Sequence, residues 1–135
     1  MIKPINLTRQ KAEEMVKAAV DERGSDFIYE KPSSFGDCMY VHNSDSEDAY
    51  AGCGIGLAFA LEGVPLETLN EYEHNDATNL VSQLKVVGVL ESFEHQARGF
   101  MQNFQAKQDV GYTWGDAYEY ALTAVVEDVF DDDEF

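Results

Sequence analysis

The chain has 135 residues, 44% of them hydrophobic, which is enough for one globular domain with its own core. Nine lysines and arginines oppose 26 aspartates and glutamates, and the formal net charge of −17 argues against direct binding to nucleic acids or anionic membranes. No segment approaches the roughly 20 apolar residues of a membrane span, and MIKPINLTRQKAEEM lacks the apolar region of a secretory signal.

Residues 8–23 are predicted to form the first helix, beginning at Thr8 and ending at Gly24. One apolar stripe runs along it at helical spacing, formed by Ala12, Met15, Val16, Ala19 and Val20. The next two apolar segments, DFIYE (26–30) and CMYVH (38–42), predict a β-hairpin whose long loop is KPSSFGD. Because an isolated hairpin is marginally stable, we expect it to lie on the helices.

Five further helical segments follow the acidic connector NSDSEDAY. The first spans residues 55–62 and ends at Gly63 and Pro65, and a short helix, PLETLNEYE, begins directly after it. A helix capped by Asn75 or Asp76 follows, with an apolar face of Ala77, Leu80, Val81, Leu84 and Val87. A long helix is expected over residues 92–108, with Phe93, Ala97, Phe100, Met101 and Phe104 on one stripe.

The last helix is predicted from a capping pair, Thr113 and Asp116, with Trp114, Ala117, Ala121, Ala124 and Val125 facing inward. In the preceding helix Gly99 interrupts the apolar stripe, which indicates close packing at that position. The sequence therefore predicts a mostly helical α+β domain over residues 1–135, with about five helices, one small antiparallel hairpin packed on them, and a frayed acidic tail at 131–135.

The glycines of YAGCGIGLAFALEGVP (50–65) suggest a phosphate-binding loop, but the pattern does not fit one. A dinucleotide fingerprint needs its third glycine where this chain has Leu57, and no Gly-Lys-Ser/Thr of a P-loop occurs. Two interpretations remain for Gly52, Gly54 and Gly56. Either bare backbone amides at a helix start bind an anion, or another part of the chain packs against that backbone, which we favour.

Metal, cofactor and catalytic motifs are weak throughout the chain. The connector fails as a calcium loop because Asp48 stands where a glycine is needed. Glu71 precedes His74 at a helical metal-site spacing, but no second ligand set accompanies the pair. Cys38 and Cys53 match no zinc pattern, and we expect buried small side chains in a reducing cytoplasm, with oxidation to a disulfide left open. We predict no metal, no cofactor and no catalytic residue.

Tyrosines and the single tryptophan gather around the hairpin and the start of the last helix. Tyr118 and Tyr120 are two residues apart on a helix, so they cannot both face one core, and an exposed aromatic side chain is a common anchor of a binding surface. The candidate ligand- or partner-binding residues are Tyr40, Tyr50, Gly52, Gly54, Gly56, Tyr112, Trp114 and Tyr118.

The ordered segments CMYV, AGCGIGLAFALEGVPLETL and QDVGYTWGDAYEYAL resemble a small-protein family of actinobacterial bacteriophages and their hosts. The resemblance spans roughly residues 38–122 and brings no established activity or cofactor. It implies framework roles for Cys38, Cys53, Gly56, Gly63 and Trp114. Relatives often carry histidine directly after the glycine matched by Gly56, whereas this chain has Leu57, so no histidine chemistry carries over.

These observations favour a non-enzymatic phage accessory protein in the cytoplasm of an infected bacterium. Its partner would be a host or anti-phage-defence protein with a basic surface, and its acidic surface would imitate nucleic acid. The plainer interpretation of the acidity is that it only keeps proteins apart. The alternative function is a small-ligand, nucleotide-like binder or sequestering protein using the helix start at 52–56, and a third is a homodimer formed through the same helix.

Overall fold

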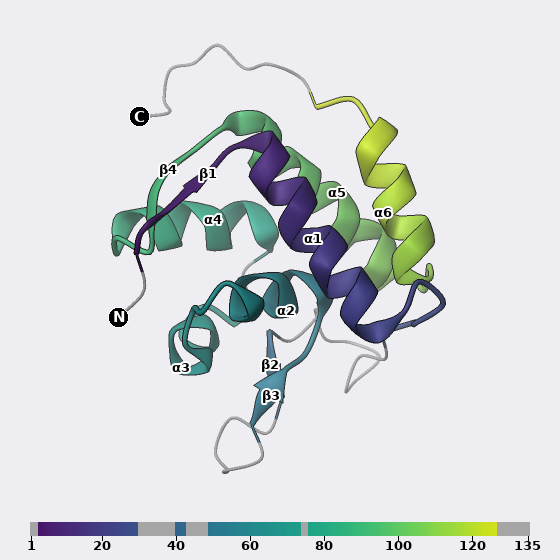
Figure 1. Ribbon diagram of the computed structural model, residues 1–135, viewed down its shortest axis with the longest axis horizontal. Helices are drawn as coiled ribbons and strands as arrows, with labels where there is room; N and C mark the ends of the chain where they lie inside the picture. The colour runs from purple at the N-terminus through teal and green to yellow at the C-terminus, as the bar shows by residue number, and fades with distance from the viewer. Residues whose placement is uncertain (1–2, 30–39, 43–48, 74–75, 127–135) are drawn as a thin grey trace.

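The computed structural model describes residues 3–29, 40–42, 49–73 and 76–126 (Figure 1). Within this part the chain is mostly helical, with six helices rather than about five, and with two small sheets. The elements in chain order are β1 (Ile5–Leu7), α1 (Arg9–Arg23), β2 (Val41–His42), β3 (Tyr50–Ala51), α2 (Gly54–Leu61), α3 (Leu66–Asn70), α4 (Ala77–Val86), β4 (Leu90–Phe93), α5 (His95–Asp109) and α6 (Trp114–Thr123).

The first helix forms as the sequence predicts. The Thr8 hydroxyl accepts a hydrogen bond from the Lys11 amide at 3.0 Å, which satisfies one of the donors left unpaired at the helix start. All five residues of the predicted stripe are buried, and Gly24 follows the helix with φ of 100°. Gly63 likewise adopts a positive φ of 98° after α2, as expected for a glycine helix stop.

The predicted hairpin is wrong in its pairing. The described residues of segment 26–30 form no strand, and β2, the end of segment 38–42, instead pairs antiparallel with β3, so that Val41 faces Ala51 and His42 faces Tyr50. Three consecutive apolar residues suggested a strand, but residues 25–26 form a turn, and after it the Phe27 carbonyl accepts the Trp114 amide at 2.8 Å. The hairpin therefore uses part of the connector that the sequence assigned to a loop.

A parallel strand pair, β1 with β4, was not predicted. Ile5 lies opposite Leu90 and Leu7 opposite Phe93. The residues before His95 were assigned to the long helix because Phe93 continues its apolar spacing, but Glu94 is the extended N-cap residue, and its amide donates to the Leu7 carbonyl at 2.9 Å. Three- and four-residue strands carry too short a pattern to be told from a helix end.

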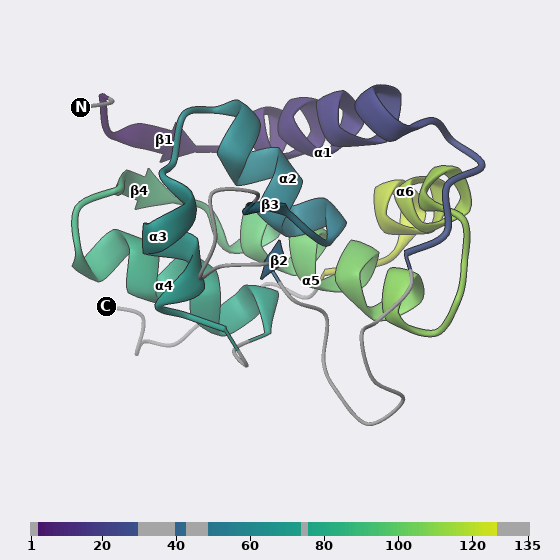
Figure 2. The same cartoon turned by 90° about the horizontal axis from the view of Figure 1, so that it is seen from below.

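Helix α5 is the centre of the fold and contacts α1, α2, α4 and α6. In Figure 2, α1 runs along the top of the molecule, α4 lies at the lower left and α6 at the right, with α5 among them. Its apolar stripe is buried from Ala97 through Phe104, as predicted. The predicted stripes of the neighbouring helices extend one turn too far, because Val87 and Val125 are exposed.

Candidate functional site

The glycine helix α2 packs closely against the backbone of Tyr40, the residue directly before strand β2. A Cβ atom on Gly56 would lie 2.6 Å from the Tyr40 carbonyl oxygen and 2.9 Å from Tyr40 Cα, so only glycine fits without moving backbone. The Gly52 amide donates to the same Tyr40 carbonyl at 2.8 Å. At Gly56 the structure confirms the favoured interpretation of the glycines, close packing by another part of the chain.

The start of α2 is also covered from the other side, by α5. The Gly54 amide donates to Gln108 Oε1 at 2.8 Å, and a Cβ atom on Gly54 would lie 2.8 Å from Phe104 Cζ. Gly52, Gly54 and Gly56 are all buried. An anion therefore has no open route to the Gly54 amide, and a second copy of the chain could not pack on these glycines without displacing Tyr40 and Phe104.

Three glutamines spaced three apart on α5 carry out this capping. Gln105 Oε1 accepts the Ala77 amide at 2.7 Å, and Gln102 Oε1 accepts the Thr78 amide at 3.1 Å, so they serve the start of α4 as Gln108 serves α2. Gln105 Nε2 also donates to the Tyr40 hydroxyl at 3.2 Å. Gln105 and Gln108 are buried polar side chains that the sequence interpretation missed, although their spacing beside an apolar stripe was a usable signal.

The predicted aromatic anchors divide into buried and exposed groups. Tyr40 and Trp114 are fully buried, so as surface anchors these two are corrected to core residues. Trp114 packs edge-on against Phe27 with ring centroids 4.6 Å apart. Tyr50 and Tyr112 are exposed by 49% and 41%, so their rings can contact another molecule.

One exposed surface combines two tyrosines with a lysine and is named the tyrosine face, formed by Lys107, Tyr112, Asp116 and Tyr120. Lys107 Nζ lies 5.1 Å from the Tyr112 ring centroid and 4.6 Å from that of Tyr120, which holds the two rings near one another. Tyr120 is 40% exposed. Asp116 lies one helical turn before Tyr120 and is exposed.

Tyr118 lies on the α1 side of α6, where acidic side chains gather. Its ring packs edge-on against Phe100, with centroids 6.0 Å apart. Burial raises the pKa of the Tyr118 hydroxyl, and the negative charges of Glu13, Glu119 and Asp21 raise it further, against an opposing effect of Lys17. Tyr118 is thus half-buried in a negative environment, and its neighbour Tyr120 is exposed, as the spacing predicted.

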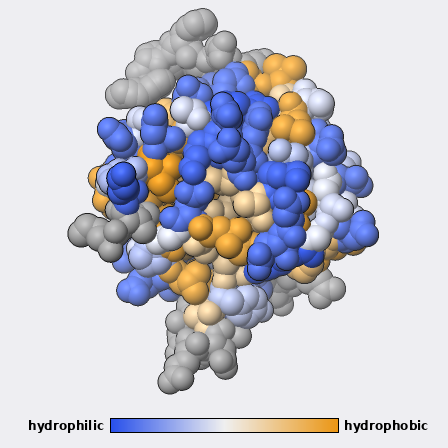
Figure 3. Space-filling view, viewed as in Figure 1, coloured by the Kyte–Doolittle hydropathy of each residue, from blue (hydrophilic) through white to orange (hydrophobic). Residues whose placement is uncertain are grey.

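Exposed charge in the described part of the chain is strongly one-sided. In Figure 3 hydrophilic side chains follow α1, and apolar surface lies beside it over α2. The exposed cationic side chains among the described residues are Lys3, Lys17 and Lys85. The exposed carboxylates there are Glu14, Asp21, Glu22, Asp26, Glu67, Glu71, Asp76, Glu91, Glu94, Asp116 and Glu119.

The three arginines of the described part form no ion pair with these exposed carboxylates; Arg9 pairs with the half-buried Glu13 at 2.6 Å, and Asp21 is paired with Lys17 at 3.1 Å. Arg9 donates to the Ala121 and Leu122 carbonyls at the end of α6. Arg98 stacks on the Phe93 ring and donates to the Ser82 hydroxyl.

The third of these arginines, Arg23, helps to line a cavity of about 350 Å³ beside the hairpin, which is named the hairpin pocket. The Arg23 guanidinium donates to the Ala51 and Gly52 carbonyls, both at 2.6 Å. The lining residues are Arg23, Phe27, Ile28, Tyr29, His42, Tyr50 and Gly52.

His42 is held between two tyrosines of this pocket. The Tyr29 hydroxyl and His42 Nε2 are 2.9 Å apart and share a hydrogen bond, and the Tyr50 ring stacks on His42 with centroids 5.3 Å apart and 17° between planes. Burial lowers the pKa of His42, partly offset by the negative charge of Glu73, while Arg23 lowers it further. Burial also lowers the pKa of the Arg23 guanidinium.

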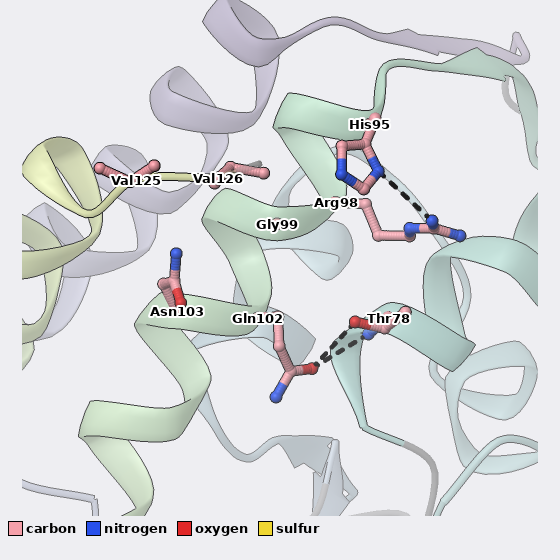
Figure 4. A pocket seen from close by; sticks show the side chains of 8 residues that line it. All are labelled: Thr78, His95, Arg98, Gly99, Gln102, Asn103, Val125 and Val126. Atoms are coloured by element: carbon pink, nitrogen blue, oxygen red, sulfur yellow. Dashed lines mark hydrogen bonds between the residues drawn. The ribbon is translucent and has the colours of Figure 1, made fainter. Parts of the chain in front are cut away.

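A second cavity of about 210 Å³ lies where α5 meets the chain after α6 (Figure 4). Gly99 lines it, and a Cβ atom there would lie 2.9 Å from Val126 Cγ2, so the predicted close packing at Gly99 is confirmed. Four of the polar side chains that line this cavity contact one another: Gln102 Oε1 accepts from Thr78, and Arg98 lies 3.5 Å from His95 Nδ1.

Some of the remaining sequence predictions concern residues that the structure describes, and others do not. Among the described residues no group of three metal-ligating side chains occurs, and none of the helices there is both long enough and apolar enough to cross a bilayer. The predictions for Cys38, His74, the connector residues 43–48 and the tail at 131–135 fall outside the described residues. Comparison with protein families, curated proteins and solved structures finds no match to this chain. Its resemblance to the phage family stays a prediction.

Proposed function

We propose that this is a non-enzymatic phage accessory protein that binds a host or anti-phage-defence protein with a basic surface. The contact is made through the tyrosine face and the carboxylates around it. The observation that carries the proposal is the pair of exposed tyrosine rings, Tyr112 and Tyr120, which both contact Lys107.

The tyrosine pair has the physical properties of a binding anchor. Tyrosine offers a large contact area with few rotatable bonds, so ordering it on binding costs little entropy. Lys107 restricts both rings before any partner arrives, which lowers this cost again. The outer ring faces can accept an arginine side chain, and Asp116 one turn away can pair with its charge.

The surrounding charge favours a basic partner over an acidic one. With a net charge of −17 and no ion pair between the described arginines and the exposed carboxylates, the protein repels other polyanions and attracts cationic surfaces at long range. A groove that normally holds nucleic acid is one such surface, so this protein would compete with nucleic acid for it. Binding of this kind weakens as salt rises, because salt screens exposed charges beyond about 8 Å at physiological ionic strength.

The experiment compares three proteins as affinity baits in lysate of a bacterial host: the wild type, the double variant Tyr112→Ala/Tyr120→Ala, and Tyr50→Ala. Tyr50 is exposed by 49%, slightly more than either tyrosine of the tyrosine face. It is therefore a matched control for the loss of an exposed ring. A captured protein is then purified, and its affinity for each bait is measured at increasing salt.

We expect a basic protein that is retained by the wild type and by Tyr50→Ala. The double variant should lose at least about tenfold in affinity, as expected when hot-spot tyrosines are removed. Equal affinity for all three baits would remove the tyrosine face from the proposal. Affinity that does not change with salt would remove the electrostatic part.

A further inference from the structure

The hairpin pocket combines a cation with aromatic walls, and it is separate from the residues of the tyrosine face. We propose that it binds a planar aromatic anion the size of a nucleoside monophosphate, with the ring against Tyr50 and His42 and the anionic group on Arg23. This proposal does not depend on the protein-binding function. The volume of the hairpin pocket, about 350 Å³, falls within the usual range for small-ligand sites.

Arg23 is the source of positive charge in this pocket. An arginine has five N–H donors, and the two hydrogen bonds that Arg23 makes, to the Ala51 and Gly52 carbonyls, leave donors for a ligand. Among the described residues no carboxylate forms an ion pair with it. A half-buried cation without a carboxylate partner attracts an anion more strongly than an exposed lysine does, because it is less screened by water.

The stacked pair of Tyr50 and His42 provides a stacking face of defined orientation on its exposed Tyr50 side. Tyr50 and His42 lie nearly parallel, and the hydrogen bond between the Tyr29 hydroxyl and His42 fixes the histidine ring in place. Tyr50 and Ile28 are each 49% exposed at this pocket, so both can be covered by a ligand. Stacking on such rings is favourable for any base, because every base has a π-face.

This site differs from the one that the sequence suggested for a nucleotide-like ligand. The glycine amides were the expected anion contacts, but the Gly54 amide is bonded to Gln108 and its surroundings are filled by Phe104. Gly52 lines the hairpin pocket, yet its amide donates to the Tyr40 carbonyl, so Arg23 takes the role of anion contact. The net negative charge of the protein opposes anion binding at long range, and physiological salt screens most of that repulsion.

The test compares 5′-AMP with adenosine, which share the ring and differ in the charged group. Trp114 is the only tryptophan in the chain, and the Arg23 guanidinium lies 5.4 Å from its ring centroid, so its fluorescence reports on a ligand at Arg23. Titrations are run on the wild type, Tyr50→Ala, Arg23→Gln and the remote control Tyr112→Ala, with folding checked by circular dichroism.

We expect 5′-AMP to bind the wild type at least about tenfold more tightly than adenosine, the value of one charge-assisted hydrogen bond. Tyr50→Ala should weaken both ligands about tenfold through lost stacking, Arg23→Gln should make the two ligands equal, and Tyr112→Ala should change nothing. No binding of 5′-AMP at millimolar concentration, or equal binding of both ligands by the wild type, would overturn the proposal. If Arg23→Gln does not fold, the wild type and Tyr50→Ala still decide it.

Discussion

The hairpin pocket and the tyrosine face are made from similar parts, a cation beside aromatic rings, but they differ in where the cation goes. Arg23 reaches inward, lies 5.5 Å from the Phe27 ring centroid and bonds two carbonyls of the β3 strand and its continuation. Lys107 lies between two rings that are both exposed. The first arrangement builds the fold and leaves a positive pocket, whereas the second only orients surface side chains. Substitutions should therefore cost stability on the hairpin side and binding on the α5–α6 side.

The largest loss of stability is expected from Gly56→Ala, on the hairpin side. The added methyl group meets the Tyr40 backbone, which cannot rotate away as a side chain can, and overpacking of this kind costs about 3 kcal/mol. The control is Gly99→Ala, also within a helix, where the three atoms nearest the added methyl group all belong to the Val126 side chain. That side chain must shift, but the gain in helix propensity offsets part of the cost, so we expect a smaller loss than at Gly56. Urea unfolding measures both, and equal losses would contradict the assignment of Gly56 as the tight contact.

Arg23→Gln should come next, with a loss of about 2 kcal/mol in the free energy of unfolding. The substitution removes a charged donor from the Ala51 and Gly52 carbonyls in a part-buried site. The matched substitution on the other side is Lys107→Gln, which removes exposed cation–π contacts and should cost less than about 1 kcal/mol. A larger loss in the free energy of unfolding for Lys107→Gln than for Arg23→Gln would contradict the proposal that the hairpin side carries more of the stability.

Gln108→Leu should destabilise the protein by about 1 to 2 kcal/mol, because it leaves the buried Gly54 amide without its acceptor. Gln102→Leu is the control, since Gln102 also accepts from a helix-start amide but is only half-buried, and water can replace it. In thermal unfolding, Gln108→Leu should have a lower melting temperature than Gln102→Leu. If Gln102→Leu is the less stable of the two, burial does not decide the value of these caps.

The smallest effect is a pH dependence from His42. Its pKa is lowered in the folded protein from the ordinary 6.5, so the unfolded chain takes up the proton more readily. His42 therefore makes its full contribution to the free energy of unfolding at a pH above its pKa in the unfolded chain. That contribution decreases as the pH drops below 6.5 toward the pKa of His42 in the folded protein. Melting temperatures from about pH 7.5 to about 5.5 should fall less steeply in His42→Gln than in the wild type. Identical slopes would contradict this role.

Long amphipathic segments were predictable from the sequence, and short pairings were not. The stripe of α1, its cap at Thr8 and its end at Gly24 follow from local rules of helix formation. The pairing of β1 with β4 joins residues more than 80 positions apart, Ile5 with Leu90, and no local rule contains that information. DFIYE satisfied a strand pattern, but its described residues form no strand, and Phe27 packs against Trp114 instead.

The sequence predicted some residues of the candidate sites, but not which groups cover them or which of them are exposed. The glycine run indicated a close approach, and Gly56 confirms it, but the identity of the covering group, the Tyr40 backbone, required the fold. Tyr50 and Tyr112 were chosen as aromatic residues and are exposed, while Trp114, chosen for the same reason, is in the core. Residue type alone does not separate these cases, because a ring that can anchor a partner can equally fill a core.

The most direct test of the proposed function is the affinity of the captured partner for wild type and for Tyr112→Ala/Tyr120→Ala, measured across a salt series with Tyr50→Ala as control. We expect the affinity to fall with salt for every protein that binds. The double variant should bind at least about tenfold more weakly at each salt concentration, while the control matches the wild type. A double variant that binds as tightly as the wild type, or a control that loses as much, would contradict it.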